Sequence, residues 1–249
     1  MSVPCESKPL ILLHGWGMDR RIFAPWLPYL QPDFRPGCWD LPGHGSRPCP
    51  PEGWDWEAEL AHLRECLLGL PQPPILLGWS LGGLIALALA LGPQPPIAGL
   101  VLAASSPCFV QRSDWSAGIP AAQLQAFADE LEGDAAAVRR RFLALQVLGD
   151  AEARRNLPRV EDWPLPDRRC LRAGLGFLQG LDLRPALRSL PFPVLILSGS
   201  DDRIVPPAAG RYLHQALSGS VLHCLPSGHA PFLAQPAACA AALREVFLP

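Results

Sequence analysis

The residues Gly78-Trp79-Ser80-Leu81-Gly82-Gly83 have the types and spacing that point most directly to chemistry. The short apolar run 74–77 before them predicts a buried strand, and the Ala- and Leu-rich run 84–91 after them predicts a helix. A Gly-x-Ser-x-Gly sequence between a strand and a helix is typical of a nucleophile elbow, where the serine sits on strained backbone. We therefore predict that Ser80 is a nucleophile. The alternative is a solvated serine in a glycine-rich turn.

Two later residues could complete a catalytic triad with Ser80. Asp202 follows the aliphatic run 193–197, and His229 follows the run 221–225. Residues just past the carboxyl ends of parallel strands lie near one another. The chain order Ser80, Asp202, His229 is that of an α/β-hydrolase triad, in which the histidine is the base and the aspartate orients it.

A third segment could bind the negative charge that forms during acyl transfer. The aliphatic run 10–13 leads into His14-Gly15-Trp16-Gly17, a tight turn that suits an oxyanion-hole loop. The backbone N–H groups of Trp16 and Leu81 are expected to bind the oxyanion. We interpret His14 as structural, and His44, in the turn Pro42-Gly43-His44-Gly45, as a loop-packing residue.

Apolar runs alternate between strand-like and helix-like patterns through most of the chain. This alternation predicts an α/β fold with a mostly parallel central sheet and helices on both faces. Residues 108–183 lack aliphatic strand runs and contain helical stretches at 121–131 and 135–148. We therefore predict a core formed by residues 1–107 and 184–249, with 108–183 as a helical lid insertion.

The composition excludes several classes of protein. Hydrophobic residues make up 49% of the 249 residues, and the net charge of −2 gives no general attraction to nucleic acid or to anionic membranes. No signal peptide and no apolar run of about 18 residues is evident, so no transmembrane helix is expected. The eight cysteines include no C-x-x-C pair, so no metal site is predicted. Such thiols suit a reducing cytoplasm. We also expect the protein to be a monomer.

Over almost its whole length the sequence resembles α/β-hydrolases. More narrowly, it resembles the pimeloyl-[acyl-carrier protein] methyl ester esterases of biotin synthesis, the BioH family. The matching segments are 13–17, 40–43, 78–83, 104–109, 142–146 and 229–232. Segments 104–109 and 142–146 are the more specific. The first strand pair of the family is shortened here, which leaves the edge of the sheet open.

The resemblance implies an activity and a set of site residues. The substrate would be the methyl ester of pimeloyl-acyl carrier protein, hydrolysed without a metal or organic cofactor. The family's Gly-x-x-Asp-x-x-Val-Pro motif selects Asp202 over Asp201 as the acid. The implied substrate contacts are Trp16, Leu81, Phe142, Leu143, Ala144, Leu145 and Gln146. Alternatives are a general short-chain carboxylesterase, a thioesterase or lactonase, and a non-catalytic binding protein on the same scaffold.

Arginines flank the segment 142–146 on both sides. An acyl carrier protein has an acidic surface, so these residues are candidates for docking it. They are Arg139, Arg140, Arg141, Arg154, Arg155 and Arg159. Consecutive helical residues point about 100° apart, so at least one of the first three is expected to be solvated or paired within the lid. The alternative for the whole set is an ordinary solvated surface.

Overall fold

One sheet of six parallel strands forms the centre of residues 7–248, the part of the chain that the computed structural model describes. The strands are β1 (Lys8–Leu13), β2 (Phe34–Trp39), β3 (Ile75–Trp79), β4 (Gly99–Ala103), β5 (Val194–Gly199) and β6 (Val221–Leu225). Their order across the sheet is β2-β1-β3-β4-β5-β6, and every pairing is parallel. All six carboxyl ends therefore lie at one edge, as the predicted α/β fold requires.

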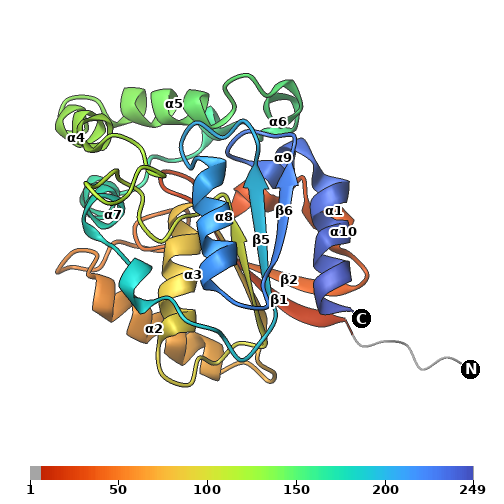
Figure 1. Ribbon diagram of the computed structural model, residues 1–249. Helices are drawn as coiled ribbons and strands as arrows, with labels where there is room; N and C mark the ends of the chain where they lie inside the picture. The colour runs from red at the N-terminus through yellow and green to blue at the C-terminus, as the bar shows by residue number, and fades with distance from the viewer. Residues whose placement is uncertain (1–6, 249) are drawn as a thin grey trace, which may run out of the picture.

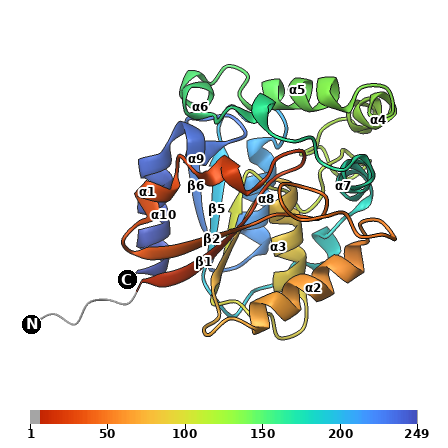
Figure 2. The ribbon, with the colours of Figure 1, turned by 180° about the vertical axis from the view of Figure 1, so that it is seen from behind.

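Helices cover both faces of this sheet (Figures 1 and 2). Alternate residues of each strand point to opposite faces, so Ile11 and Leu13 join one apolar core while Leu10 and Leu12 join the other. The first core is covered by α2 (Trp56–Leu68), α3 (Leu81–Leu91) and α8 (Pro207–Ala216). The second is covered by α1 (Leu27–Leu30), α9 (Pro231–Ala234) and α10 (Pro236–Phe247).

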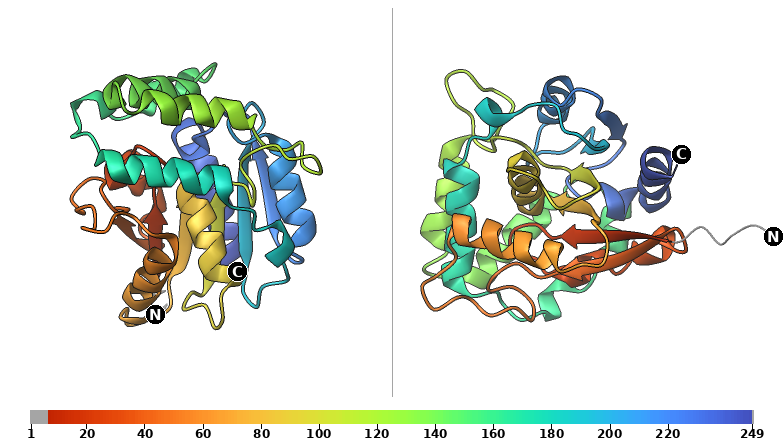
Figure 3. Two further views of the ribbon diagram at one scale, coloured as in Figure 1. Left: turned by 90° about the vertical axis from the view of Figure 1, so that its left-hand side faces the viewer. Right: turned by 90° about the horizontal axis from the view of Figure 1, so that it is seen from below.

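Four more helices lie over the carboxyl ends of the strands (Figures 1 and 3). They are α4 (Ala121–Glu130), α5 (Ala135–Gln146), α6 (Ala151–Asn156) and α7 (Arg168–Gly180). Short 3-10 turns occur at Arg20–Phe23, Val160–Asp162 and Arg184–Ala186. The helices predicted at 121–131 and 135–148 correspond to α4 and α5. Asp134, Asp150 and Asp167 begin α5, α6 and α7, each accepting a hydrogen bond from a backbone N–H of the first turn.

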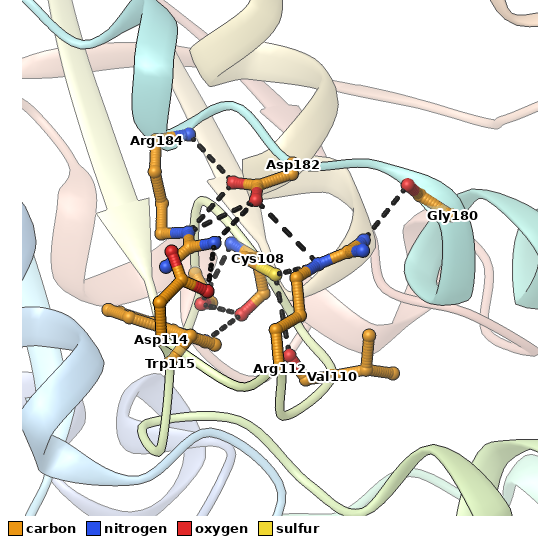
Figure 4. A network of polar contacts seen from close by, with 9 residues as sticks. Cys108, Val110, Arg112, Asp114, Trp115, Gly180, Asp182 and Arg184 are labelled. Atoms are coloured by element: carbon orange, nitrogen blue, oxygen red, sulfur yellow. Dashed lines mark hydrogen bonds and ion pairs between the residues drawn. The ribbon is translucent and has the colours of Figure 1, made fainter.

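A polar network joins the chain entering these helices to the chain leaving them (Figure 4). Arg184 contacts Asp182 at 2.6 Å and Asp114 at 3.1 Å, and its guanidinium lies 5.1 Å from the ring centre of Trp115. Arg112 adds a second cation 3.6 Å from Asp182. Side chains near residue 112 and near residue 183 are thus held together at the base of the helical layer.

One edge of the sheet is formed by β2, which pairs with β1 from Lys8↔Phe34 to Leu13↔Trp39. The sequence alone does not determine this edge, and residues 1–6 lie outside the described part of the chain. Among the described residues, no helix has the length and apolar character that crossing a membrane requires.

Candidate active site

Ser80 lies at the tip of the turn between β3 and α3, with φ 55° and ψ −117°. This positive φ is unfavourable for any residue with a side chain, and such strain costs on the order of 1–3 kcal/mol. The flanking glycines make the turn possible, because a Cβ at Gly78 would overlap the backbone of Gly82, and a Cβ at Gly82 would overlap that of Leu13. The predicted elbow geometry is therefore present.

The structure brings the three predicted triad residues into one hydrogen-bonded chain. Ser80 Oγ lies 2.9 Å from His229 Nε2, and His229 Nδ1 lies 2.8 Å from Asp202 Oδ2. All three residues are buried. With the proton on Nδ1, the imidazole donates to Asp202 and presents Nε2 as an acceptor for the serine hydroxyl, which is the arrangement that nucleophilic catalysis needs.

Asp202 and its neighbour Asp201 lie in different environments. Asp202 Oδ1 accepts from the N–H groups of Ile204 at 2.8 Å and Val205 at 2.9 Å, which leaves Oδ2 directed at the imidazole. Asp201 is exposed, and its carboxylate accepts only from the Ser200 hydroxyl, at 2.8 Å, within residues 7–248. The geometry therefore places Asp202, the residue that the motif selects, at the histidine.

Sequence reasoning missed two side chains that support this arrangement. Ser105 Oγ donates to the carbonyl oxygen of Ser80 at 2.9 Å, although the sequence indicated only a loop residue. Trp79 Nε1 donates to the carbonyl oxygen of His229 at 2.7 Å. Both contacts use backbone carbonyl groups, which no side-chain motif could reveal.

The N–H groups of Trp16 and Leu81 are available to bind an oxyanion. Leu81 opens α3 directly after the serine, at the positive end of the helix. Within residues 7–248, neither N–H has a hydrogen-bond partner. Unpaired backbone donors are rare in protein interiors, and both residues are fully buried. They fit the role that the sequence predicts for them.

The predicted substrate-contact residues differ in exposure. Trp16 packs edge-on against Phe142, with ring centres 4.9 Å apart, and both rings are buried together with Leu81. Gln146 is also buried, and its Nε2 has no partner among the described residues. Leu143 and Leu145 are half-buried, and Ala144 is exposed. A helix cannot direct five consecutive side chains into one pocket, so Phe142 and Gln146 remain the strongest candidates on α5.

One further residue borders these side chains and was not predicted. Gly174 on α7 faces Trp16 and Leu81, and a Cβ at this position would lie 2.9 Å from the Trp16 ring and 3.2 Å from Leu81 Cδ2. The absent side chain lets α7 approach the site closely.

The predicted docking arginines also differ in burial and in their ion-pair partners. Arg139 is buried, and its guanidinium donates to the carbonyl oxygens of Trp163 and Pro164 at 3.2 and 3.1 Å. Its charge is therefore not accessible to a partner, and the prediction of Arg139 as a docking residue is wrong. Arg141 pairs with Glu130 at 2.6 Å, and Arg155 pairs with Glu152 at 2.9 Å.

The remaining arginines of that set are Arg140, Arg154 and Arg159. All three are exposed. None forms an ion pair within the described part of the chain, so their charges are available at the surface.

The two buried histidines near the site have structural contacts. His14 Nε2 accepts from the Leu41 N–H at 3.0 Å, while Nδ1 donates to the Gly15 carbonyl at 2.8 Å. His44 Nδ1 donates to the Pro42 carbonyl at 2.8 Å. Burial lowers the pKa of both imidazoles, that of His44 to about 3. Both histidines are therefore neutral near pH 7.

One cluster in residues 7–248 offers three possible metal ligands. The ligand atoms of Cys49, Asp167 and Cys170 lie within 4.8 Å of one another. Asp167 is already paired with Arg169 at 3.1 Å, and burial raises the pKa of the Cys170 thiol. A metal ion needs thiolates and free carboxylate oxygens, so this cluster fits one poorly.

The model of the alpha/beta hydrolase family matches residues 10–242. A pimeloyl-[acyl-carrier protein] methyl ester esterase from Aromatoleum aromaticum is 39% identical, over 95% of this chain and 97% of its own. One from Stenotrophomonas maltophilia is 38% identical, over 98% and 95%. The chain belongs to the alpha/beta hydrolase family and, within it, to the pimeloyl-[acyl-carrier protein] methyl ester esterases.

Solved structures show how widely this hydrolase shares its fold. An esterase from Exiguobacterium antarcticum superposes with a TM-score of 0.86 at 24% identity, covering 96% of this chain and 91% of its own. An enol-lactonase from Burkholderia xenovorans gives 0.84 at 22% identity, covering 98% and 92%. These likenesses support the α/β-hydrolase fold alone, because both proteins are less than 25% identical to this chain.

Proposed function

We propose that this hydrolase is a serine carboxylesterase that works through an acyl-enzyme. The observation that carries the proposal is the hydrogen-bonded chain from Ser80 through His229 to Asp202, with the serine at a strained elbow. An intact chain of this kind also argues against a non-catalytic binding protein, since binding alone needs neither the strain nor the buried charge.

The mechanism follows from the positions of these groups. Ser80 Oγ attacks the ester carbonyl while His229 Nε2 accepts its proton, and the imidazolium then protonates the leaving alcohol. Asp202 stabilises that cation and holds its tautomer. The N–H groups of Trp16 and Leu81 bind the oxyanion, each contributing about 3 kcal/mol to the transition state. Water then attacks the acyl-enzyme by the same steps, and the free acid leaves.

The proposed substrate is the methyl ester of pimeloyl-acyl carrier protein, which would give methanol and pimeloyl-acyl carrier protein. The support is the similarity to the two pimeloyl-[acyl-carrier protein] methyl ester esterases named above, which are 38–39% identical over nearly the whole chain. The apolar side chains of Trp16, Leu81 and Phe142 would line the path of the acyl chain. We propose that residues 108–183 act as a lid over Ser80, and that the carrier docks on the exposed Arg140, Arg154 and Arg159.

The proposed location is the cytoplasm, where thiols stay reduced. Seven cysteines in the described residues are free. A short-chain carboxylesterase or a thioesterase would use the same triad, and the relative rates on carrier-bound and small esters distinguish these functions.

The decisive experiment compares wild type with Ser80→Ala on two substrates. Wild type should release methanol from pimeloyl-carrier methyl ester with a higher kcat/KM than it shows on short p-nitrophenyl esters. Ser80→Ala should lower kcat on both by about 10⁴ to 10⁶-fold while remaining folded by circular dichroism. A Ser80→Ala protein that keeps a tenth of wild-type kcat would contradict the esterase mechanism. Preference for small esters would contradict the carrier substrate alone.

A further inference from the structure

The loop that carries His229 is held in place from two sides. It connects β6 to α9, and none of its residues before His229 belongs to a helix or strand. From the sheet side, Trp79 Nε1 donates to the His229 carbonyl at 2.7 Å. From the lid side, the Gln146 carbonyl accepts from the His229 N–H at 3.3 Å, and Asp150 Oδ2 accepts from the Gly228 N–H at 2.9 Å. Hydrogen bonds therefore hold both the backbone N–H and the backbone carbonyl of His229.

Asp150 has two separate contacts through its two oxygens. Its Oδ1 accepts from the Ala153 N–H at 2.8 Å and so caps α6, while its Oδ2 reaches across to Gly228. The lid and the loop meet closely here, because a Cβ at Gly228 would lie 3.2 Å from the Gln146 carbonyl oxygen. A carboxylate is a strong acceptor for backbone N–H groups, so this is the firmer of the two contacts from the lid side.

The position of this contact matters for the chemistry. His229 must hold Nε2 at the Ser80 hydroxyl and Nδ1 at Asp202 together, at 2.9 and 2.8 Å. A displacement of about 1 Å can lower the rate of such a step by about 10²-fold. Gly228 directly precedes His229, so movement of its peptide is passed to the imidazole. Asp150 itself touches no reacting atom.

We propose that Asp150 is a positioning residue for His229, so that the lid completes the triad by holding the loop of its base. This inference rests on the proposed esterase chemistry. It adds that segment 146–150 sets the geometry of the base, in addition to the proposed role of the lid in covering Ser80. A lid displaced from the core would release Gly228 and His229 together.

The rival explanation is that Asp150 only caps α6. A matched control is available, because Asp134 caps α5 through the same kind of contact, Oδ1 to the Ala137 N–H at 2.9 Å. In the described residues the Asp134 side chain has no contact with the loop of His229. Serine is also a good N-cap, so Asp150→Ser and Asp134→Ser both keep a capping group. Only Asp150→Ser loses the bond to Gly228.

A cavity of about 510 Å³ makes the Asp150→Ser protein suitable for this test. Asp150, Gly228 and Asp202 are among the residues that line it. Water can therefore enter and pair with the Gly228 N–H once the carboxylate is gone. The substitution removes the link to the lid without leaving a buried donor unpaired.

The experiment measures kcat and KM on p-nitrophenyl acetate, together with thermal unfolding. We expect Asp150→Ser to lower kcat about tenfold with little change in KM, and Asp134→Ser to keep wild-type kcat. The two variants should have similar melting temperatures. The low-field proton resonance of His229 Nδ1–H, which reports the bond to Asp202, should shift or broaden in Asp150→Ser only.

Equal kcat values for the two variants, or an unchanged Nδ1–H resonance in Asp150→Ser, would overturn the proposal. Should Asp150→Ser fail to fold, Asp150→Thr paired with Asp134→Thr gives the same test, because threonine also caps a helix N-terminus through its one hydroxyl. A wild-type protein inactive on every ester would count against the proposed function. The proton resonance would still report whether Asp150 positions the histidine.

Discussion

Asp201 and Asp202 show how strongly the environment of one residue decides its role. Asp202→Asn should lower kcat by about 10⁴-fold, because the amide would stabilise the wrong imidazole tautomer and would not stabilise the cation. Asp201→Asn changes an exposed carboxylate that contacts only Ser200 among the described residues. It should stay within about twofold of wild type. Parallel kcat measurements of both variants on one small ester check this. A larger loss of kcat in Asp201→Asn than in Asp202→Asn would make Asp201 the triad acid.

The triad could be predicted from the sequence because each member belongs to a local motif. Ser80 lies in the elbow, and Asp202 precedes Val205-Pro206 at a fixed spacing. Asp150, Trp79 and Ser105 could not be predicted in the same way. Each acts through a backbone atom of a residue distant in sequence, and such contacts follow from the packing of the folded chain.

At the scale of elements, most strands were predictable and the helices over their carboxyl ends only partly so. Strands β1, β3, β4 and β5 are largely buried and appear as continuous apolar runs, whereas β2 is only partly buried and its sequence contains no such run. Helices α4 and α5 repeat apolar residues at helical spacing and could be placed. Helices α6 and α7 were missed as separate elements. Helix α6 has only six residues, whereas α7 was overlooked although its buried residues Leu171, Leu175 and Leu178 recur at helical spacing.

The turn that follows β2 gives a prediction about pH. It contains His44, whose ring lies 5.2 Å from that of His14. Burial, and then the neighbouring His14, lower the pKa of His44 from 6.5 to about 3. At pH values between about 3 and 6.5, His44 is therefore protonated in the unfolded chain and neutral in the folded one. The free energy of unfolding therefore falls as the pH falls, by about 2 kcal/mol at pH 5 from this residue.

Urea unfolding at pH 7 and pH 5 checks this effect. His44→Asn can still donate to the Pro42 carbonyl through its amide, and it cannot be protonated. The loss of stability between the two pH values should therefore be about 2 kcal/mol smaller in His44→Asn than in wild type. His62→Asn, at an exposed position on α2, serves as the control and should keep the wild-type difference. If the pH dependence of stability is the same in His44→Asn as in wild type, His44 is not responsible for the loss of stability between pH 7 and pH 5.

At the scale of the whole molecule, the charges near the lid predict how a carrier protein would bind. Arg140 and Arg154 are exposed and have no ion-pair partner in the described residues. Rim charges act mainly on association, and salt screens them. The double variant Arg140→Glu, Arg154→Glu should raise KM for the carrier-bound ester about tenfold at low salt. KM for a p-nitrophenyl ester should not change.

Arg35→Glu is the matched control for this experiment. Arg35 is exposed near the start of β2, at the amino end of the sheet and away from the site. It should leave both KM values unchanged. Equal losses on both substrates in the double variant would mean that the two arginines support the lid itself. Unchanged values on both would remove the electrostatic argument for a carrier at this surface.

The two ends of the helical segment 108–183 lie close together beside the sheet. The Leu183 N–H donates to the Pro107 carbonyl at 2.8 Å, beside the network around Arg184. Where the ends of a long segment already touch, its length adds only logarithmically to the entropy of closing it. The sheet is therefore little affected by how much chain lies between those two residues. A replacement segment could therefore change substrate choice while the sheet and the elbow stay in place, provided that it keeps an acceptor where Asp150 holds the Gly228 N–H.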